Sequence, residues 1–270
     1  MKFPKIIKNI VRTNRLQPFW EFMLDMTLYG MNIGPASLPH YSGESYLLAN
    51  VIQVLHKKTG SKITVFDVGA NIGNYALEVH AALGVRARIF CFEPSCDTFE
   101  MLSNNTRSVS TIIKYNHGFS DREEVLELFS DMKGSGLASL YDRRLDHQGT
   151  HLQNKETVKL STVDIFCRDN GIKTIDLLKV DVEGHEYKVF SGAREMLDAD
   201  AIDMIQFEFG GCNIDSRTYF QDFYYLLNSK YRLYRLVFDG LAPIDTYNEK
   251  YEQFRTTNFI AIHRKIGQVE

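Results

Sequence analysis

The sequence lacks several features that would place it in a specialised class of protein. Its 270 residues include four cysteines, and these form no C-x-x-C pair: Cys91, Cys96, Cys167 and Cys212. Because the segments around Cys91 and Cys167 are apolar, we expect reduced thiols in a reducing compartment, and neither disulfides nor a zinc site. The chain also has no apolar run of transmembrane length and no signal-peptide pattern. We therefore expect a soluble, cytoplasmic protein.

An excess of charge of one sign is also absent. The formal net charge is −3, so the composition gives no electrostatic reason to expect nucleic acid as a partner. The sequence has no internal repeat and no low-complexity tract. With 44% hydrophobic residues the chain can bury a full core. We expect one domain overall, with residues 1–60 as a helical lead-in packed on the core and residues 61–270 as the functional domain.

The first residues, Met1 to Leu16, carry basic side chains and no acid. Apolar residues alternate with them at near-helical spacing, and the cations are Lys2, Lys5, Lys8, Arg12 and Arg15. This pattern is compatible with a helix that binds a membrane surface or a partner. A solvated leader that packs on its own domain is the simpler interpretation, because basic and apolar residues are common at chain ends.

The remaining chain alternates between strand and helix patterns, which predicts an α/β fold with a doubly wound, mostly parallel sheet and helices on both faces. The last two strands lie close together in sequence without a long helix between them, so we expect an antiparallel strand near the C-terminal edge. The polar segment 132–155 is expected to be a loop or a mobile lid. Strands are predicted at 63–67, 87–93, 112–117, 125–130, 158–161, 175–181, 201–208, 231–238 and 258–264, and helices at 19–28, 44–57, 74–83, 96–107, 163–170, 187–197 and 219–227.

The segment Val65–Tyr75 has the pattern of a buried strand, a glycine-rich turn and the start of a helix. Asp67 ends the strand, and we expect Gly69 and Gly73 to remove side chains where the backbone approaches a ligand. An ordinary tight turn would have the same pattern. A second apolar run ends at Glu93, at the distance from Gly69 that one βαβ unit requires. A carboxylate there can bind two ribose hydroxyls, at about 1.5–3 kcal/mol for each charge-assisted bond, or it can be a plain helix-terminus charge.

Two classes of cofactor fit this pair of signals, a dinucleotide and S-adenosylmethionine. The turn has the spacing G-x-N-x-G, with Asn71 at its centre, and not the dinucleotide pattern G-x-G-x-x-G. Asp67 would repel a pyrophosphate, whereas it can attract the ammonium group of S-adenosylmethionine. The sequence therefore favours S-adenosylmethionine, and a nicotinamide-dependent oxidoreductase stays as the alternative.

Acidic residues gather where the predicted strands end, and ligands of open parallel sheets bind outside these carboxyl ends. His185 is the preferred general base, because imidazole titrates near neutral pH. Asp181 and Glu183 are rival bases, and a structural histidine at a helix start is the plain alternative. Asp181, Glu183 and Glu208 could also hold Mg²⁺ or Ca²⁺. An acidic rim without a metal accounts for them equally well, so a metal is not favoured, and Glu208 is taken as a substrate contact.

The order of these motifs resembles the FkbM-type family of S-adenosylmethionine-dependent methyltransferases. The resemblance covers residues 63–210 and rests on VFDVGANIG, CFEPS, GFSD, LLKVDVEGHE and IQFEFG. It implies the class I methyltransferase fold, which is Rossmann-like, and O-methylation of a hydroxyl on a sugar, a glycoconjugate or a secondary metabolite. The acceptor would thus be a small molecule or a carbohydrate. By position, the resemblance implies that the cofactor is bound by Asp67, Gly69, Asn71, Gly73, Glu93, Ser120 and Asp121. A cofactor-binding module without turnover remains open.

Overall fold

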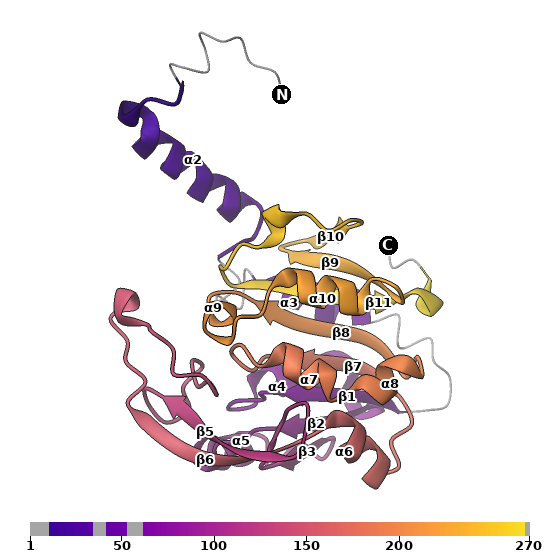
Figure 1. The fold of residues 1–270 in the computed structure, drawn as a ribbon. Coiled ribbons are helices and arrows are strands. Elements are labelled where there is room, and N and C mark those ends of the chain that lie inside the picture. The colour runs from indigo at the N-terminus through magenta and orange to yellow at the C-terminus, as the bar shows by residue number, and fades with distance from the viewer. Residues whose placement is uncertain (1–10, 35–41, 53–61, 268–270) are drawn as a thin grey trace.

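The computed structural model describes residues 11–34, 42–52 and 62–267 (Figure 1). Its large sheet contains β1 (Ile63–Val68), β2 (Ala87–Phe92), β3 (Ile112–Tyr115), β7 (Ile175–Val180), β8 (Ile202–Phe209), β9 (Tyr231–Val237), β10 (Gly240–Ile244) and β11 (Thr257–His263). The strand order is β10-β9-β11-β8-β7-β1-β2-β3. The order reverses beside β1, which is where ligands bind in folds of this type.

The sheet is mostly parallel, as predicted. β1 pairs in parallel with β2 and β7, whereas β11 lies antiparallel between β8 and β9. The predicted antiparallel strand near the C-terminal edge is thus confirmed. The hairpin between β9 and β10 was not predicted. Its turn contains Asp239 followed by Gly240, a dipeptide that is common in hairpin turns.

Helices cover both faces of the large sheet, because neighbouring residues of each buried strand face opposite sides. Phe66 packs with Val163 and Phe190 on one face, and Val65 packs with Val79 on the other. Figure 1 shows α7, α8 and α10 in front of the sheet. The helices are η1 (Asn14–Leu16), α2 (Gln17–Gly30), α3 (Glu44–Tyr46), η3 (Leu47–Val51), α4 (Asn74–Leu83), η5 (Gly84–Arg86), α5 (Cys96–Asn105), η6 (Asp146–Gln148), α6 (Val163–Asp169), α7 (Glu186–Ser191), α8 (Arg194–Asp198), α9 (Cys212–Ser216), α10 (Phe220–Leu227), η7 (Glu249–Tyr251) and η8 (Arg264–Ile266).

The single helix predicted at 187–197 is two helices, α7 and α8, with a break at Gly192. A Cβ atom on Gly192 would lie 2.0 Å from the carbonyl oxygen of Ser120. The close approach of the chain at Ser120 therefore requires glycine and interrupts the helix.

Three short strands form a second sheet that the sequence only partly indicated. They are β4 (Gly118–Phe119), β5 (Glu124–Ser130) and β6 (Asn154–Ser161), in the order β4-β6-β5. β6 begins earlier than expected, inside the segment predicted to be a loop. The rest of that segment lies between β5 and β6 and contains η6.

The predicted lead-in packs on the core only in its later part. Leu47, Leu48 and Val51 of η3 are buried, whereas Leu28 is the only buried residue of α2. Figure 1 shows α2 projecting away from the two sheets. Residues 1–10 of the basic leader, and residues 53–57 of the helix predicted at 44–57, lie outside the described residues. None of the described helices is long and apolar enough to cross a membrane.

Candidate functional site

A cavity of about 790 Å³ lies at the carboxyl ends of the central strands, and its size is in the range of small-molecule sites. The sequence predicted that acidic strand ends would meet in one crevice. Four of them line this cavity: Glu93, Asp181, Glu183 and Glu208. They come from the ends of β2, β7 and β8, which the fold brings to the same edge of the sheet.

Asp67 is not among the residues that line the cavity, although the sequence placed it in the cofactor loop. Its side chain is fully buried, and the Nζ atom of Lys179 lies 3.8 Å from its Oδ1 atom. Neither carboxylate oxygen receives a hydrogen bond from the described residues. Burial raises its pKa to about 6, and Lys179 opposes the shift. Because Lys179 also donates to Asp181 at 3.0 Å, Asp67 can act on the cavity through this lysine.

The glycines of the predicted cofactor turn are required by contacts within the protein. Gly69 has a φ of +81°, and a Cβ atom there would lie 1.8 Å from the carbonyl oxygen of Asp181. A Cβ atom on Gly73 would lie 2.7 Å from a methyl group of Leu102 on α5. The sequence assigned both glycines to the approach of a ligand. Gly69 lines the cavity, and it also lets the ends of β1 and β7 meet, whereas Gly73 is not among the lining residues.

Glu93 lies at the cavity wall and is held by two backbone amides. Its Oε2 accepts from the N–H of Asn71 and its Oε1 from the N–H of Ser95, both at 3.0 Å. Burial raises its pKa to about 7, and these two hydrogen bonds oppose the shift. A carboxylate offers about four acceptor positions, so room remains for the two hydroxyls of a ribose.

Asn71 lines the cavity next to Glu93 and has a φ of 45°. Its Nδ2 donates to the carbonyl oxygen of Ser135 at 3.3 Å. Its Oδ1 is buried and has no hydrogen-bond partner among the described residues. Because a buried acceptor without a partner is costly, this atom fits a ligand that carries a donor, such as a hydroxyl or an ammonium group.

Apolar residues that the sequence did not single out form another wall of the cavity. They are Phe119, Leu128, Leu137, Leu140 and Leu160, from the second sheet and the segment after β5. Such a wall suits the flat ring of an adenine. The alternation of apolar and polar residues in β5 and β6 could have indicated this face.

Ser120 and Asp121, which the resemblance placed beside the adenine, do not line the cavity. Ser120 is buried within a hydrogen-bond network, and Asp121 binds Lys188 at 2.6 Å. The hydrogen bond from Lys188 lowers the pKa of Asp121. In this structure Phe119, one position earlier, reaches the cavity in their place.

His185 lines the cavity but uses both ring nitrogens for bonds within the protein. Nε2 lies 3.0 Å from Ser120 Oγ, and Nδ1 lies 3.1 Å from the hydroxyl of Tyr141. Because the Ser120 hydroxyl has one proton and donates it to Glu124 at 2.6 Å, it accepts from Nε2–H, and Nδ1 then accepts from Tyr141. Burial lowers the pKa of His185 to about 4. This geometry makes His185 a weak base with no free lone pair.

Glu183 combines an unusual backbone with a charged partner. Its φ is 51°, and its carboxylate accepts a hydrogen bond from Arg143, whose side chain is buried. Burial and the charge of Asp181 raise the pKa of Glu183 to about 8, and Arg143 opposes them. Ser139 also donates to its carbonyl oxygen at 2.7 Å. The segment between β5 and β6, which was expected to be a loop or lid, is thus bound to the loop after β7.

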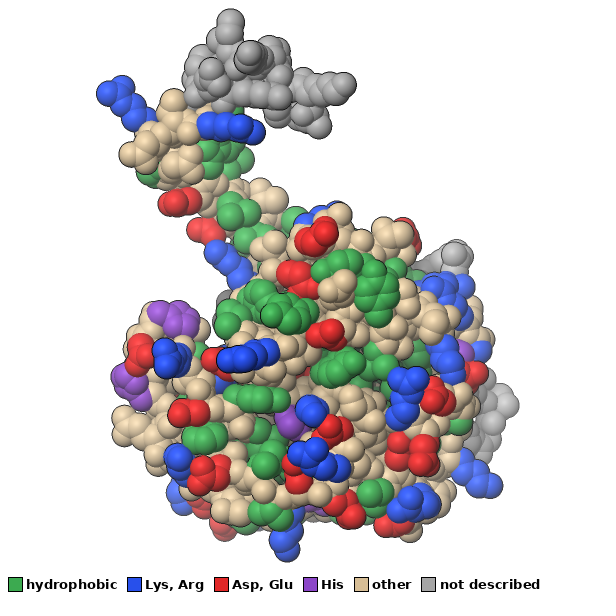
Figure 2. Space-filling view, viewed as in Figure 1, with side chains coloured by type: hydrophobic (Ala, Val, Ile, Leu, Met, Phe, Trp, Pro, Cys, Tyr) green, Lys and Arg blue, Asp and Glu red, His purple; other side chains and the backbone are tan. Residues whose placement is uncertain are grey.

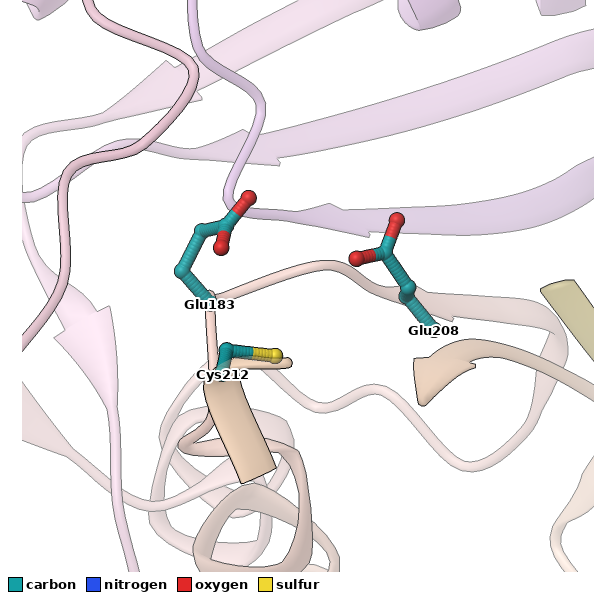
Figure 3. A group of neighbouring side chains, drawn as sticks. All are labelled: Glu183, Glu208 and Cys212. Atoms are coloured by element: carbon teal, nitrogen blue, oxygen red, sulfur yellow. The ribbon is translucent and has the colours of Figure 1, made fainter. Parts of the chain in front are cut away.

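Figure 3 shows Glu183, Glu208 and Cys212 together, each with one ligand atom within 4.8 Å of the others. This group differs from the expected metal set in having Cys212 in place of Asp181. Burial raises the pKa of Cys212 well above that of a free thiol, and Mg²⁺ and Ca²⁺ prefer oxygen ligands. Arg143 already neutralises Glu183, and Lys179 binds Asp181. The residues present therefore do not fit a resident Mg²⁺ or Ca²⁺ ion.

Three comparisons with known proteins bear on this site. The family model described as "Methyltransferase FkbM domain" matches residues 67–236. The hexuronic acid methyltransferase AglP of Haloferax volcanii is 30% identical over 56% of this chain, and the 2-O-methyltransferase NoeI of Sinorhizobium fredii is 26% identical over 49% of it. The chain spans 58% of the length of each of these curated relatives.

Solved structures with a similar chain course were also found. The methyltransferase FkbM of Methylobacillus flagellatus has a TM-score of 0.46 at 15% identity, and the match covers 74% of this chain and 43% of that one. The O-methyltransferase TomG of Streptomyces achromogenes, solved with S-adenosylmethionine, has a TM-score of 0.42 at 10% identity over 82% of this chain and 80% of that one.

Proposed function

Because the chain belongs to the FkbM methyltransferase family, we propose that it transfers the methyl group of S-adenosylmethionine to a hydroxyl oxygen of a sugar or a similar polyhydroxyl compound. The observation that carries the proposal is that one cavity is lined by Asn71, whose buried Oδ1 has no partner among the described residues, and by the carboxyl groups of Asp181, Glu183 and Glu208. Membership of a methyltransferase family favours S-adenosylmethionine as the cofactor over a nicotinamide dinucleotide.

The cofactor side is formed by Asn71, Glu93 and the apolar wall that includes Phe119 and Leu160. Glu93 would hold the ribose hydroxyls, Asn71 Oδ1 would accept from a donor of the cofactor, and the apolar wall would cover the adenine. When bound, S-adenosylmethionine would supply a methyl group on a positively charged sulfur, and its carbon–sulfur bond would break to leave the neutral thioether S-adenosylhomocysteine.

The acceptor side is formed by Asp181, Glu183 and Glu208. We assign the general base to Glu183, because both nitrogens of His185 are occupied and because a base with a pKa near the working pH is the most effective. The hydroxyl proton of the acceptor would pass to the Glu183 oxygen that Arg143 does not bind, as the acceptor oxygen bonds to the methyl carbon. His185 would be a positioning residue, because it joins Tyr141, in the segment between β5 and β6, to Ser120.

The lining of the cavity suits an acceptor that carries hydroxyl groups. Carboxyl groups outnumber cationic side chains among the lining residues: Glu44, Glu93, Asp181, Glu183 and Glu208 against Arg143 and Arg255. Carboxyl groups offer several acceptor atoms to hydroxyl donors. The names of the two relatives, a hexuronic acid methyltransferase and a 2-O-methyltransferase, support a sugar derivative and an oxygen target respectively.

The experiment has two parts. Titration calorimetry with S-adenosylhomocysteine tests the cofactor side, with Glu93→Gln as the matched variant because it keeps the shape of the side chain. Incubation with methyl-labelled S-adenosylmethionine and a panel of free sugars and glycosides, followed by mass analysis, tests the acceptor side. We expect binding that the variant weakens and a labelled methyl ether.

Folded protein that does not bind S-adenosylhomocysteine would overturn the proposal. Binding without transfer to any hydroxyl compound in the panel would instead support a cofactor-binding module. A substitution at Gly69 is a poor control, because a side chain there collides with the backbone at Asp181.

A further inference from the structure

The helix α2 presents a continuous apolar face to solvent. Phe19, Phe22, Met23, Met26 and Tyr29 each have a neighbour in this set three or four residues away, which places them on one side of the helix. Their exposed fractions run from 41% for Met23 to 61% for Tyr29. Figure 2 shows hydrophobic side chains along the projecting helix. Large exposed apolar patches of this kind mark interaction sites.

The C-terminal part of α2 joins the helix to the domain. Leu28 is the buried residue of α2, and Asp25 binds Arg255 at 2.8 Å. Gln17, Glu21 and Asp25 are spaced by four residues and form a polar strip on the side opposite the apolar face. The other residues of α2 are exposed, so none of the described residues covers the apolar face.

The sequence just before α2 is basic. Arg12 and Arg15 immediately precede α2, and the sequence before them adds Lys2, Lys5 and Lys8. No acidic residue occurs before Glu21. From this combination we propose that α2 docks on the surface of a lipid bilayer that contains anionic lipids, with its apolar face in the interface and the cations on the headgroups.

The dimensions and composition of the helix support an interfacial position. Its 14 residues span about 21 Å, which is shorter than the hydrocarbon core of about 30 Å. Phe19, Trp20 and Tyr29 are the aromatic types that gather at membrane interfaces. A second copy of the helix would also match the apolar face, but it would bring the same cations, Arg12 and Arg15, to the contact, whereas anionic headgroups would pair with them.

The chain provides its own reporter for the test. Trp20 is its only tryptophan, and it lies on α2 with 41% of its surface exposed. We expect the fluorescence of the full chain to shift to the blue when vesicles of phosphatidylcholine and phosphatidylserine are added. Vesicles of phosphatidylcholine alone should give a smaller shift, and added salt should reduce the response to the anionic vesicles.

Two variants separate the contributions of the face and of the charge. The triple variant F19S/F22S/M26S should lower partitioning onto anionic vesicles at least tenfold in co-sedimentation. The variant R12E/R15E should remove the preference for anionic vesicles. The control V85S/V125S removes exposed apolar side chains from other parts of the surface, and it should partition as the unchanged chain does.

Each variant is first shown to be folded by its circular dichroism and its affinity for S-adenosylhomocysteine. The proposal would be overturned if F19S/F22S/M26S partitioned onto vesicles as well as the unchanged chain does. It would also be overturned if the chain responded equally to anionic and to neutral vesicles. Sedimentation velocity without vesicles tests whether a second copy of the chain covers the apolar face of α2. A dimer that the triple variant abolishes, in a chain that does not bind vesicles, would assign the face to a second copy and would also overturn it.

Discussion

Glu93 shows how one residue can be both buried and prepared for a ligand. Burial favours its neutral form, and the amides of Asn71 and Ser95 favour its charged form, which together place the pKa at about 7. The nearby acids Asp67 and Glu156 add to the raised value. The group is therefore part-ionised near neutral pH, and a ligand that donates hydrogen bonds to it will favour ionisation.

This balance predicts a pH-dependent affinity for the cofactor. A carboxylate accepts hydrogen bonds more strongly than a neutral carboxyl, so the affinity for S-adenosylhomocysteine should rise as the pH increases through about 7, by up to about tenfold. Calorimetry from about pH 6 to about pH 8 measures it. Glu93→Gln should bind more weakly with a flatter profile, and a profile equally steep in that variant would assign the titration to another group.

The assignment of the base predicts different kinetics for Glu183 and His185. Glu183→Gln should lower kcat by about 10²-fold or more, with cofactor affinity unchanged, because the variant cannot accept the proton. The rate of the unchanged enzyme should rise with pH through about 8, since the base must be ionised. His185→Gln should cost much less, because Gln can keep one bond to Ser120 or Tyr141. The reverse order of effects would make His185 the base.

Individual site residues were predictable only where the strand ends decide their position. Glu93, Asp181, Glu183 and Glu208 lie at or just after the ends of strands, and parallel strands bring these ends together. Asp67 is the last residue but one of β1, and its side chain is buried with Lys179 3.8 Å away. The direction of a side chain near a strand end depends on register, and the motif alone does not give it.

The positions of β1, β2 and β7 agree closely with the strands predicted from the sequence, because buried parallel strands have long apolar runs. The second sheet was less predictable. β6 begins with the polar residues Asn154, Lys155 and Glu156, and three of its first four residues are exposed. Its pairing with β5 over Glu124 to Ser130 is a long-range contact that local composition does not show.

The break between α7 and α8 predicts a strong effect of a small substitution. Gly192→Ala would place a methyl group 2.0 Å from the carbonyl oxygen of Ser120, so the backbone must move. We expect a loss of about 1–3 kcal/mol in the free energy of unfolding, measured by urea denaturation. Gly30→Ala is the control for the effect of glycine replacement in general, because no atom lies within 4 Å of its Cβ position and its φ is not positive. Equal losses in the two variants would contradict a role for the Ser120 contact.

For the molecule as a whole, ligand binding and stability should be coupled, because the cavity joins residues from both sheets and from the loop after β7. Saturation with S-adenosylhomocysteine at about 100 times its Kd should stabilise the fold by about 2.7 kcal/mol. Thermal unfolding with and without the ligand measures the shift in Tm. Glu93→Gln should reduce the shift at the same ligand concentration. An unchanged Tm of the original chain would contradict binding to the native state.

The arrangement of α2 and the cavity predicts that membrane docking and chemistry are separable. None of Phe19, Phe22 and Met26 lines the cavity. Asp25 of α2 forms an exposed ion pair with Arg255, and Arg255 lines the cavity. Such a pair contributes about 0.2–1 kcal/mol, so changes on the apolar face should transmit little to the site. F19S/F22S/M26S should therefore keep its affinity for S-adenosylhomocysteine and its turnover of a water-soluble acceptor within about twofold. Radiometric methyl transfer without vesicles checks this, and a parallel loss of turnover would show that α2 belongs to the catalytic unit.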